Sequence, residues 1–208
     1  MAQPAPSSEA AAAHRTGAPR IGILALQGDV REHVEAVRAI GAVPVPVRLP
    51  PDLVGLDALI LPGGESTTMR KLIDTYGLRG PIMALARGGA PMYGTCAGMI
   101  LLAERLSDDE QPVLPLLDIT VQRNAYGRQL DSYEADIPIP EIGEEPVRGV
   151  FIRAPVVTEE GPGIEVLARD EWERPIAVRQ GKVLATAFHP ELTDDRRLHR
   201  VLLEMIGS

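Results

Sequence analysis

Apolar runs and amphipathic stretches alternate along most of the chain. The runs IGILAL (residues 21–26) and LDALIL (56–61) are too continuous for half-exposed strands, which predicts two strands buried on both faces. Between them, residues 30–41 have helical periodicity, with an apolar stripe of Val30, Val34, Val37 and Ile40. Asp29 is expected to cap this helix, Gly41 to end it, and residues 43–48 to complete a β-α-β unit.

The same alternation continues toward the C-terminus. In chain order, the predicted elements are a helix at 67–77 capped by Ser66, a strand at 90–95, a helix at 97–106, strands at 115–123 and 181–190, and a helix at 193–207 with Leu198, Val201, Leu202 and Met205 on its apolar side. Residues 124–174 are richer in Pro, Gly and charge, which suggests short strands or hairpins. This order predicts an α/β fold, with helices on both faces of a mostly parallel sheet.

Composition limits the classes of function. The chain has 208 residues, 45% of them hydrophobic, which is enough for one domain, expected at residues 20–208 after a disordered extension at 1–19. A net charge of −8 argues against nucleic acid or an anionic membrane as partner. The sequence has neither an apolar run of membrane-spanning length nor a signal peptide, and its one cysteine fits a reducing compartment, so we expect a cytoplasmic protein.

Cys96 is the first candidate for chemistry. It lies in GTCAG (residues 94–98), where a predicted strand gives way to a helix, and this is the G-x-nucleophile-x-G form of a nucleophile elbow. The following helix N-terminus favours the thiolate, and the amide of Ala97 can face a developing oxyanion. The alternative is a buried structural cysteine in a tight turn, since free cysteines are often buried.

A cysteine nucleophile needs a base, and the chain has four histidines. His14 lies in the predicted extension, His33 on the first helix and His199 on a final helix that looks exposed. His189 remains, at the end of a predicted strand, with Glu191 two residues later to orient it. The alternative is a histidine that only ends a strand before a proline turn.

The stretch LPGGEST (residues 61–67) ends another predicted strand. The amides of Gly63 and Gly64 can approach a ligand closely, so either is a candidate for a second oxyanion donor beside Ala97. Glu65 and Ser66 could hold a polar substrate group. An ordinary strand-to-helix turn is the alternative, but three strand ends would meet at one edge of the sheet.

The motifs LPGGEST, GTCAGMI and FHPEL, in this order, resemble those of class I glutamine amidotransferases. Longer stretches, among them LILPGGESTTMRKLIDTYG, QRNAYGRQLDSYEADI and GVFIRAP, resemble the glutaminase subunits of two-component pyridoxal 5′-phosphate synthases, over nearly all of residues 21–206. The resemblance implies a flavodoxin-like three-layer sandwich and a Cys-His-Glu triad. Cys96 would attack L-glutamine to form a γ-glutamyl thioester and release ammonia, His189 would be the base and Glu191 its orienting partner.

The resemblance also implies a substrate site and a partner. The positions that match the family's glutamine-binding residues are Gly64, Glu65, Ser66, Arg123, Ile152 and Arg153. An arginine could clamp the substrate's α-carboxylate or brace an acidic loop. The alternative for Arg123 and Arg153 is that they only form salt bridges at the surface. The ammonia would pass to a TIM-barrel synthase subunit in a complex of twelve copies of each. Docking to that subunit would complete the oxyanion hole.

The expected contact with the synthase includes the segment LQGDVREH (residues 26–33), where Asp29 stands at a position that holds a small residue in many family members. Hydrolysis of glutamine needs no cofactor, and the sequence shows no metal-binding cluster. Three other functions stay open: a cysteine redox sensor or chaperone of the related flavodoxin-like superfamily, an inactive binding module, and a glutaminase that serves a different synthase.

Overall fold

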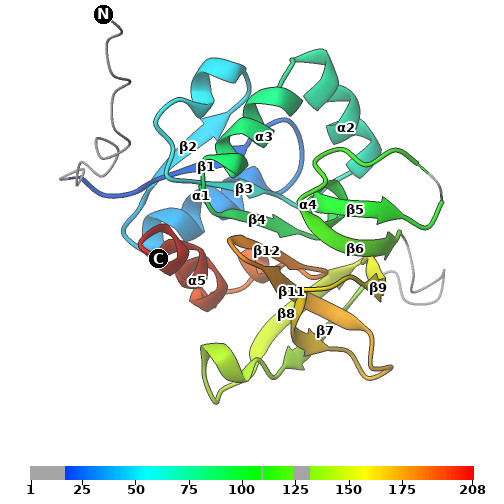
Figure 1. Ribbon diagram of the computed structural model, residues 1–208. Helices are drawn as coiled ribbons and strands as arrows, with labels where there is room; N and C mark the ends of the chain where they lie inside the picture. Colours follow the sequence, from blue (N-terminus) through cyan, green and yellow to red (C-terminus); the bar gives the residue numbers. More distant parts are fainter. Residues whose placement is uncertain (1–16, 109, 124–131) are drawn as a thin grey trace, which may run out of the picture.

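A seven-stranded sheet forms the centre of the molecule (Figure 1). The computed structural model describes residues 17–108, 110–123 and 132–208. In spatial order the strands are β10 (Glu165–Arg169), β11 (Pro175–Gln180), β12 (Val183–Thr186), β4 (Met92–Thr95), β3 (Ala58–Leu61), β1 (Arg20–Leu24) and β2 (Val43–Val47). The five strands from β12 to β2 run parallel, while β11 is antiparallel to both of its neighbours, β10 and β12.

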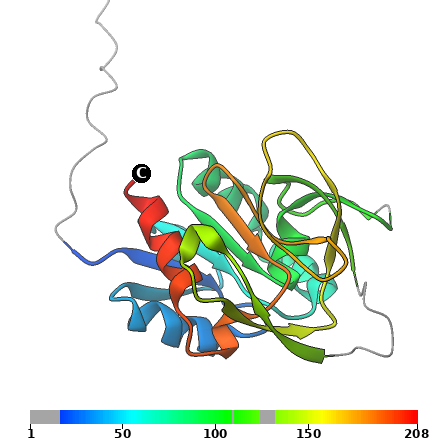
Figure 2. The ribbon, with the colours of Figure 1, turned by 90° about the horizontal axis from the view of Figure 1, so that it is seen from below.

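Helices cover both faces of this sheet (Figures 1 and 2). On one face α1 (Val30–Ala39) lies beside α5 (Arg197–Ile206), and His33 of the first contacts His199 of the second. The other face carries α2 (Ser66–Thr75), α3 (Arg79–Arg87) and α4 (Ala97–Leu102). The predicted α/β fold, a flavodoxin-like sandwich with a mostly parallel sheet, is therefore confirmed.

The remaining strands form two smaller sheets. A three-stranded sheet contains β5 (Ala103–Leu106), β6 (Leu117–Gln122) and β9 (Val156–Glu160). An antiparallel pair contains β7 (Ser132–Ile137) and β8 (Val147–Ile152), and the 3-10 turns are η1 (Pro50–Leu53), η2 (Pro140–Ile142) and η3 (Pro190–Leu192). The short strands predicted after residue 124 are thus present, although residues 124–131 themselves, like residues 1–16 of the expected extension, lie outside the described ranges.

Three local predictions were wrong. The helix predicted at 97–106 ends at Leu102, because residues 103–106 pair with β6 as strand β5. The cap of α2 is Glu65 rather than Ser66, since the Glu65 carboxylate accepts hydrogen bonds from the amides of Thr67 (3.0 Å) and Thr68 (2.7 Å). Helix α3 was missed because Gly80 and Pro81 look like helix breakers, although proline is tolerated in a first turn.

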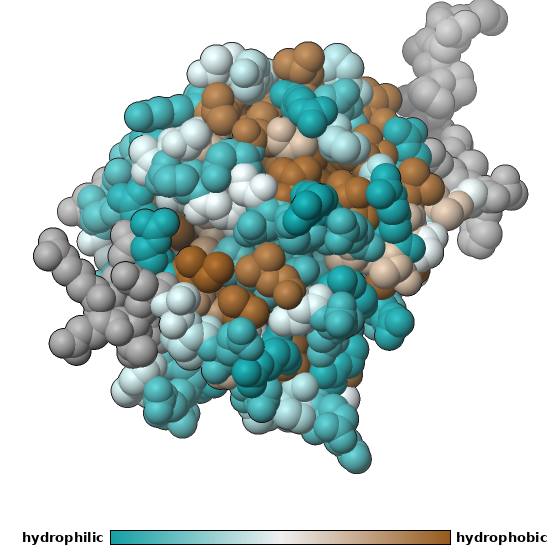
Figure 3. All heavy atoms as spheres, turned by 180° about the vertical axis from the view of Figure 1, so that it is seen from behind, coloured by the Kyte–Doolittle hydropathy of each residue, from teal (hydrophilic) through white to brown (hydrophobic). Residues whose placement is uncertain are grey.

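The core agrees with the apolar runs. Strands β1, β3 and β4 are buried along almost their whole length, as expected for strands covered on both faces. On the face shown in Figure 3, apolar surface is interrupted by polar side chains. None of the helices in the described ranges has the length and apolar character needed to cross a membrane.

Candidate active site

Cys96 sits on a sharp turn between β4 and α4. Its backbone is in the left-handed region, with φ 48° and ψ −103°, and its amide donates a hydrogen bond to the carbonyl of Thr186 (2.8 Å). A non-glycine residue in such a conformation costs about 1–3 kcal/mol, which the surrounding structure must supply. The side chain is 94% buried but borders a pocket, and its Sγ lies 3.8 Å from the carbonyl oxygen of Ile152. The strained turn is the elbow that the sequence predicted.

The two glycines of the elbow are required by close packing. A Cβ on Gly98 would lie 2.0 Å from the carbonyl oxygen of Leu61 on β3, and one on Gly94 would lie 2.6 Å from the backbone of Gly98. Both positions therefore exclude any larger residue. The close packing of α4 against β3 and β4 therefore places the start of α4, and with it Cys96, at the edge of the sheet.

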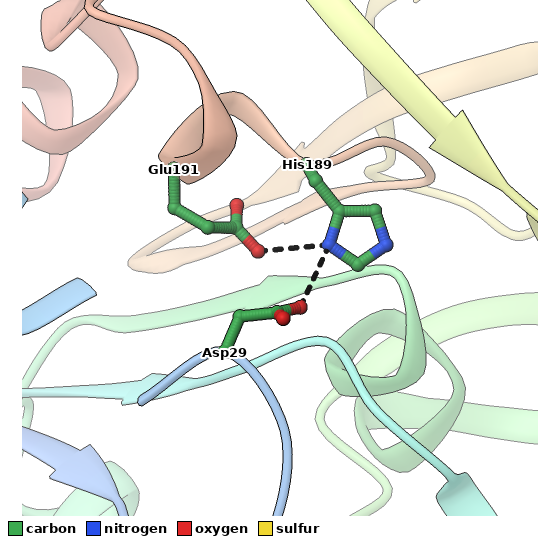
Figure 4. Close-up of side chains that lie close together, drawn as sticks. All are labelled: Asp29, His189 and Glu191. Atoms are coloured by element: carbon green, nitrogen blue, oxygen red, sulfur yellow. Dashed lines mark hydrogen bonds and ion pairs between the residues drawn. The ribbon is translucent and has the colours of Figure 1, made fainter. Parts of the chain in front are cut away.

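His189 follows β12 and meets Cys96 at this edge. Its Nδ1 lies 2.9 Å from Oε1 of Glu191 and 3.1 Å from Oδ2 of Asp29 (Figure 4). Glu191 accepts the hydrogen bond from Nδ1 and Asp29 pairs with the same nitrogen, so Nε2 points away from both carboxylates (Figure 4). It is the nitrogen left to hydrogen-bond with Cys96. Burial alone would lower the pKa of His189, but hydrogen bonds to Asp29, Cys96 and Glu191 outweigh burial and raise it to about 12.

Glu191 lies behind the imidazole and is 97% buried. Burial would raise the pKa of its carboxyl group, but the electrostatic and hydrogen-bonding contributions of His33 and His189 prevail and hold the pKa well below the usual range. Glu191 is therefore ionised at neutral pH. Its charge favours an imidazolium at His189.

A buried polar cluster supports Glu191 from the side away from the pocket; we call Thr95, His33 and His199 the rear cluster. The Thr95 hydroxyl donates to Glu191 Oε1 (3.1 Å) and accepts from the amide of Gly63 (3.1 Å). Nε2 of His33 lies 3.2 Å from Thr95 Oγ1 and 3.4 Å from Glu191 Oε1, and Nδ1 of His33 lies 3.1 Å from His199 Nε2.

The rear cluster contradicts one interpretation of the sequence. His199 was predicted on an exposed helix face, yet it and His33 are fully buried. Burial, followed by repulsion from His33, lowers the pKa of His199 to about 3. Within the described chain, Oε2 of Glu191 and Nδ1 of His199 are buried without a hydrogen-bond partner.

A pocket of about 590 Å³ opens in front of Cys96 and His189, a size that suits a small molecule. The structure brings nearly all of the predicted site residues to its wall: Gly64, Glu65, Ser66, Cys96, Ala97, Arg123, Ile152, Arg153 and His189. Glu191 is the exception, because it lies behind the ring of His189. Sequence reasoning missed other lining residues, namely Gln27, Asp29, Thr67, Ile100 and Asp108.

The loop that contains Gly63 and Gly64, which we call the Gly-Gly loop, is held by hydrogen bonds on both sides. Gly63 donates its amide proton to Thr95, so it is not available to an oxyanion, contrary to one of the two predicted options. The amides of Gly64 and Ala97 have no acceptor among the described residues, which leaves them free to face a ligand. Gln27 holds the loop from the other side, since its Oε1 accepts from the amide of Glu65 at 2.6 Å.

The two predicted arginines differ in their surroundings. Arg123 is engaged by acidic side chains, with Nε 2.9 Å from Asp108 Oδ2 and a terminal nitrogen 3.1 Å from Glu110 Oε1, so it braces an acidic loop. Arg153 is exposed, has φ 43°, and has no ion-pair partner within the described part of the chain. A guanidinium held at a strained backbone beside a pocket is suited to a carboxylate ligand.

Asp29 was interpreted as a helix cap, but its side chain makes no capping hydrogen bond and contacts His189 instead. With His189 and Glu191 it places ligand atoms within 4.8 Å of one another, a spacing at which a metal ion could be held. The hydrogen bonds from Nδ1 already account for both contacts, so we assign no metal to these residues.

Comparisons with known proteins give a consistent result. The model of the SNO glutamine amidotransferase family matches residues 23–208. The chain is 56% identical to a "Pyridoxal 5'-phosphate synthase subunit PdxT" from Desulforudis audaxviator, covering 90% of this chain and 98% of that protein, and 56% identical to one of the same name from Acidothermus cellulolyticus, covering 91% and 95%. A solved structure described as "Crystal structure of glutamine amidotransferase" superposes with a TM-score of 0.85 at 50% identity, over 90% of this chain and 99% of that one.

Proposed function

The chain belongs to the SNO glutamine amidotransferase family, and from this premise we propose that it is the glutaminase subunit of a pyridoxal 5′-phosphate synthase. It hydrolyses L-glutamine to L-glutamate and ammonia, and residues 20–208 form the glutaminase domain. The observation that carries the proposal is the strained Cys96, which meets His189 and Glu191 at the edge of a pocket of suitable size. The names of the relatives favour this synthase over another one.

The triad supplies the chemistry of two half-reactions. Because His189 rests as the imidazolium and already holds the proton of Cys96, Sγ attacks the side-chain amide carbon of glutamine as the thiolate. His189 then gives its Nε2 proton to the leaving nitrogen, so that ammonia departs and a γ-glutamyl thioester remains. The neutral His189 then takes a proton from water, which attacks the thioester, and Cys96 is released as the thiolate beside the restored imidazolium, with glutamate as product. Glu191 keeps the ring oriented and compensates its positive charge.

Charge on the tetrahedral intermediates falls on the former amide oxygen. The amides of Ala97 and Gly64 are the donors we assign to it, since both border the pocket and have no acceptor among the described residues. Loss of one such donor typically costs about 10²- to 10³-fold in turnover. Docking of the synthase subunit is expected to complete this oxyanion hole.

The amino-acid end of glutamine needs a polar site at the mouth of the pocket. We assign the α-carboxylate to Arg153, whose guanidinium has no ion-pair partner within the described chain, with Arg123 as the brace of the acidic loop that holds Asp108. Glu65 is anionic there: its hydrogen bonds with Thr68 and Thr67 outweigh burial and lower its pKa to about 2. Ser66 and Ile152 complete the set of substrate contacts.

The partner is a TIM-barrel synthase subunit, which receives the ammonia in an assembly of twelve copies of each chain. No cofactor takes part in the hydrolysis itself. A redox sensor of the same superfamily is the main alternative, but that function would require neither the Glu191 partner of His189 nor the substrate loop at residues 63–66.

Glutamate release from L-glutamine tests the proposal, measured for the chain alone, with its synthase subunit, and for a Cys96→Ala variant under both conditions. We expect release to rise on addition of the synthase and to vanish in the variant. A complex that forms but releases no glutamate would contradict the proposed function and favour the sensor.

A further inference from the structure

Asp29 stands at a helix N-cap position but does not cap the helix. It occupies the N-cap of α1, where a carboxylate normally accepts from the amides of the first turn and stabilises the helix by about 1 kcal/mol. Its side chain makes no such bond and lies 3.1 Å from Nδ1 of His189 (Figure 4). The position of the Asp29 side chain is therefore explained by its contact with the buried imidazole and not by helix capping.

Two backbone contacts hold Asp29 in this place. Its amide donates to the carbonyl of Gly63 at 3.2 Å, and Gly28, with φ +95°, brings the chain so close that a Cβ there would lie 1.7 Å from the same oxygen. A Cβ on Gly63 would lie 2.8 Å from Asp29 Oδ2 and 2.2 Å from the ring of His189. Glycine at both positions therefore makes the room in which carboxylate and imidazole meet.

We propose that Asp29 is a positioning residue for the base: its carboxylate shares the Nδ1 proton of His189 with Glu191, keeps the ring charged in the resting chain, and turns Nε2 toward Cys96. This inference rests on the proposed function, in which His189 is the base. It makes the charge on His189 depend on two carboxylates from distant parts of the chain, one on η3 and one at the start of α1. The second of them, Asp29, is 30% exposed at the side chain and lines the pocket, whereas Glu191 is enclosed.

The surroundings of His189 leave these two carboxylates as its close charged neighbours. Cys96 faces the ring from the start of α4, and His33 faces Glu191 from α1. The charged groups on the remaining walls of the pocket are Glu65, Asp108, Arg123 and Arg153. Because opposite charges within about 4–6 Å move a pKa by about 1–3 pH units, removal of Asp29 should change the titration of His189 measurably.

The test is the titration of His189 followed by NMR of the histidine rings in the free chain, for wild type, Asp29→Asn, Asp29→Ala and Glu35→Gln. Glu35 is the matched control, since it is an exposed carboxylate on α1 that pairs only loosely with Arg31 at 4.0 Å. We expect His189 to stay an imidazolium over the range in which wild type and the control remain folded. In both Asp29 variants the imidazolium should begin to lose its proton within that range, because removal of the Asp29 carboxylate lowers the pKa of His189 by about one pH unit or more.

A His189 ring that stays an imidazolium over the same pH range in the two folded Asp29 variants, as in wild type, would overturn the proposal. Thermal melting of each variant shows whether it is folded, and the nearly isosteric Asp29→Asn keeps the test open if Asp29→Ala is unstable. A second readout is the alkaline limb of kcat/KM for glutamate release with the synthase present, which should move to lower pH in Asp29→Asn. If wild type itself released no glutamate, the proposed function would fail while the NMR result on Asp29 would still stand.

Discussion

The two sides of the His189 ring differ in almost every physical respect. In front lies an open pocket whose charged groups, such as Arg153 and Glu65, are in contact with water. Behind lies the rear cluster with Glu191, where His33, Thr95 and His199 are fully buried and bonded mainly to one another.

This difference decides what each side can contribute. A buried polar group that loses its partner costs about 1–3 kcal/mol, whereas an exposed ion pair is worth about 0–1 kcal/mol. In the proposed mechanism the rear side therefore fixes the geometry and charge of His189, and the front side selects the ligand. Variants behind the ring should affect turnover and stability, and variants in front should affect substrate binding.

The largest effect is expected at Glu191, where the two sides meet. Glu191→Gln keeps the volume but removes the charge that stabilises the His189 imidazolium, so kcat should fall by roughly 10³- to 10⁴-fold with little change in KM. Steady-state glutamate release in the assembled complex measures both constants, with Glu35→Gln as control. A loss below about tenfold would mean that Glu191 does not act on the base.

The next effect concerns the stability of the rear cluster. The pKa of His199 is about 3 in the folded chain, against 6.5 for the unperturbed side chain, because of burial and then the repulsion of His33. Below about pH 6.5 the His199 side chain is protonated in the unfolded chain but stays neutral in the folded chain. The free energy of unfolding therefore falls as pH falls, and at pH 5 it is lower by about 2 kcal/mol than at neutral pH.

His199→Gln keeps a polar group for His33 but cannot titrate. We therefore expect the melting temperature of the variant to lie below that of wild type at about pH 7 and the gap to narrow at about pH 5. Melting curves at the two pH values give the comparison. A gap of constant size would show that His199 does not resist protonation.

A front-side change should separate binding from chemistry. Arg153→Ala removes the guanidinium we assign to the α-carboxylate, and loss of a charged hydrogen bond corresponds to a rise in KM of about tenfold or more. We expect kcat to change little, since Arg153 does not touch the triad. The opposite pattern, a fall in kcat at constant KM, would place Arg153 in the chemistry.

The smallest effect is expected for Asp108, an exposed partner of Arg123 whose side chain is 42% accessible. Asp108→Asn should lower the free energy of unfolding by less than about 1 kcal/mol, because water screens the pair. Its KM should rise only slightly. Denaturant unfolding and steady-state kinetics of this variant give a baseline for Arg153→Ala.

Local patterns were sufficient for the elements that meet at the site. The elbow around Cys96 could be predicted because the strain and close packing of that turn require small residues, here Gly94 and Gly98, at fixed spacing. His189 and Glu191 could be predicted because both follow closely after one buried strand, β12.

The rear cluster and Asp29 could not be predicted in this way. His33 and His199 are 166 residues apart in the chain, so their contact leaves no local pattern. Each lies beside the apolar stripe of its helix, but periodicity does not tell a buried histidine there from an exposed one. Asp29 has the sequence context of an ordinary N-cap, and only the packing of Gly28 against Gly63 reveals its contact with the base. Polar groups buried by tertiary packing leave little local signal.

The central claim is that Cys96 attacks the amide carbon of glutamine, and covalent labelling tests it most directly. The assembled complex is treated with a diazoketone analogue of glutamine, with and without excess L-glutamine, and the site of modification is read by peptide mass spectrometry. The account predicts one label per chain, on Cys96, that L-glutamine prevents. A label elsewhere, or one on Cys96 that L-glutamine fails to prevent, would contradict it.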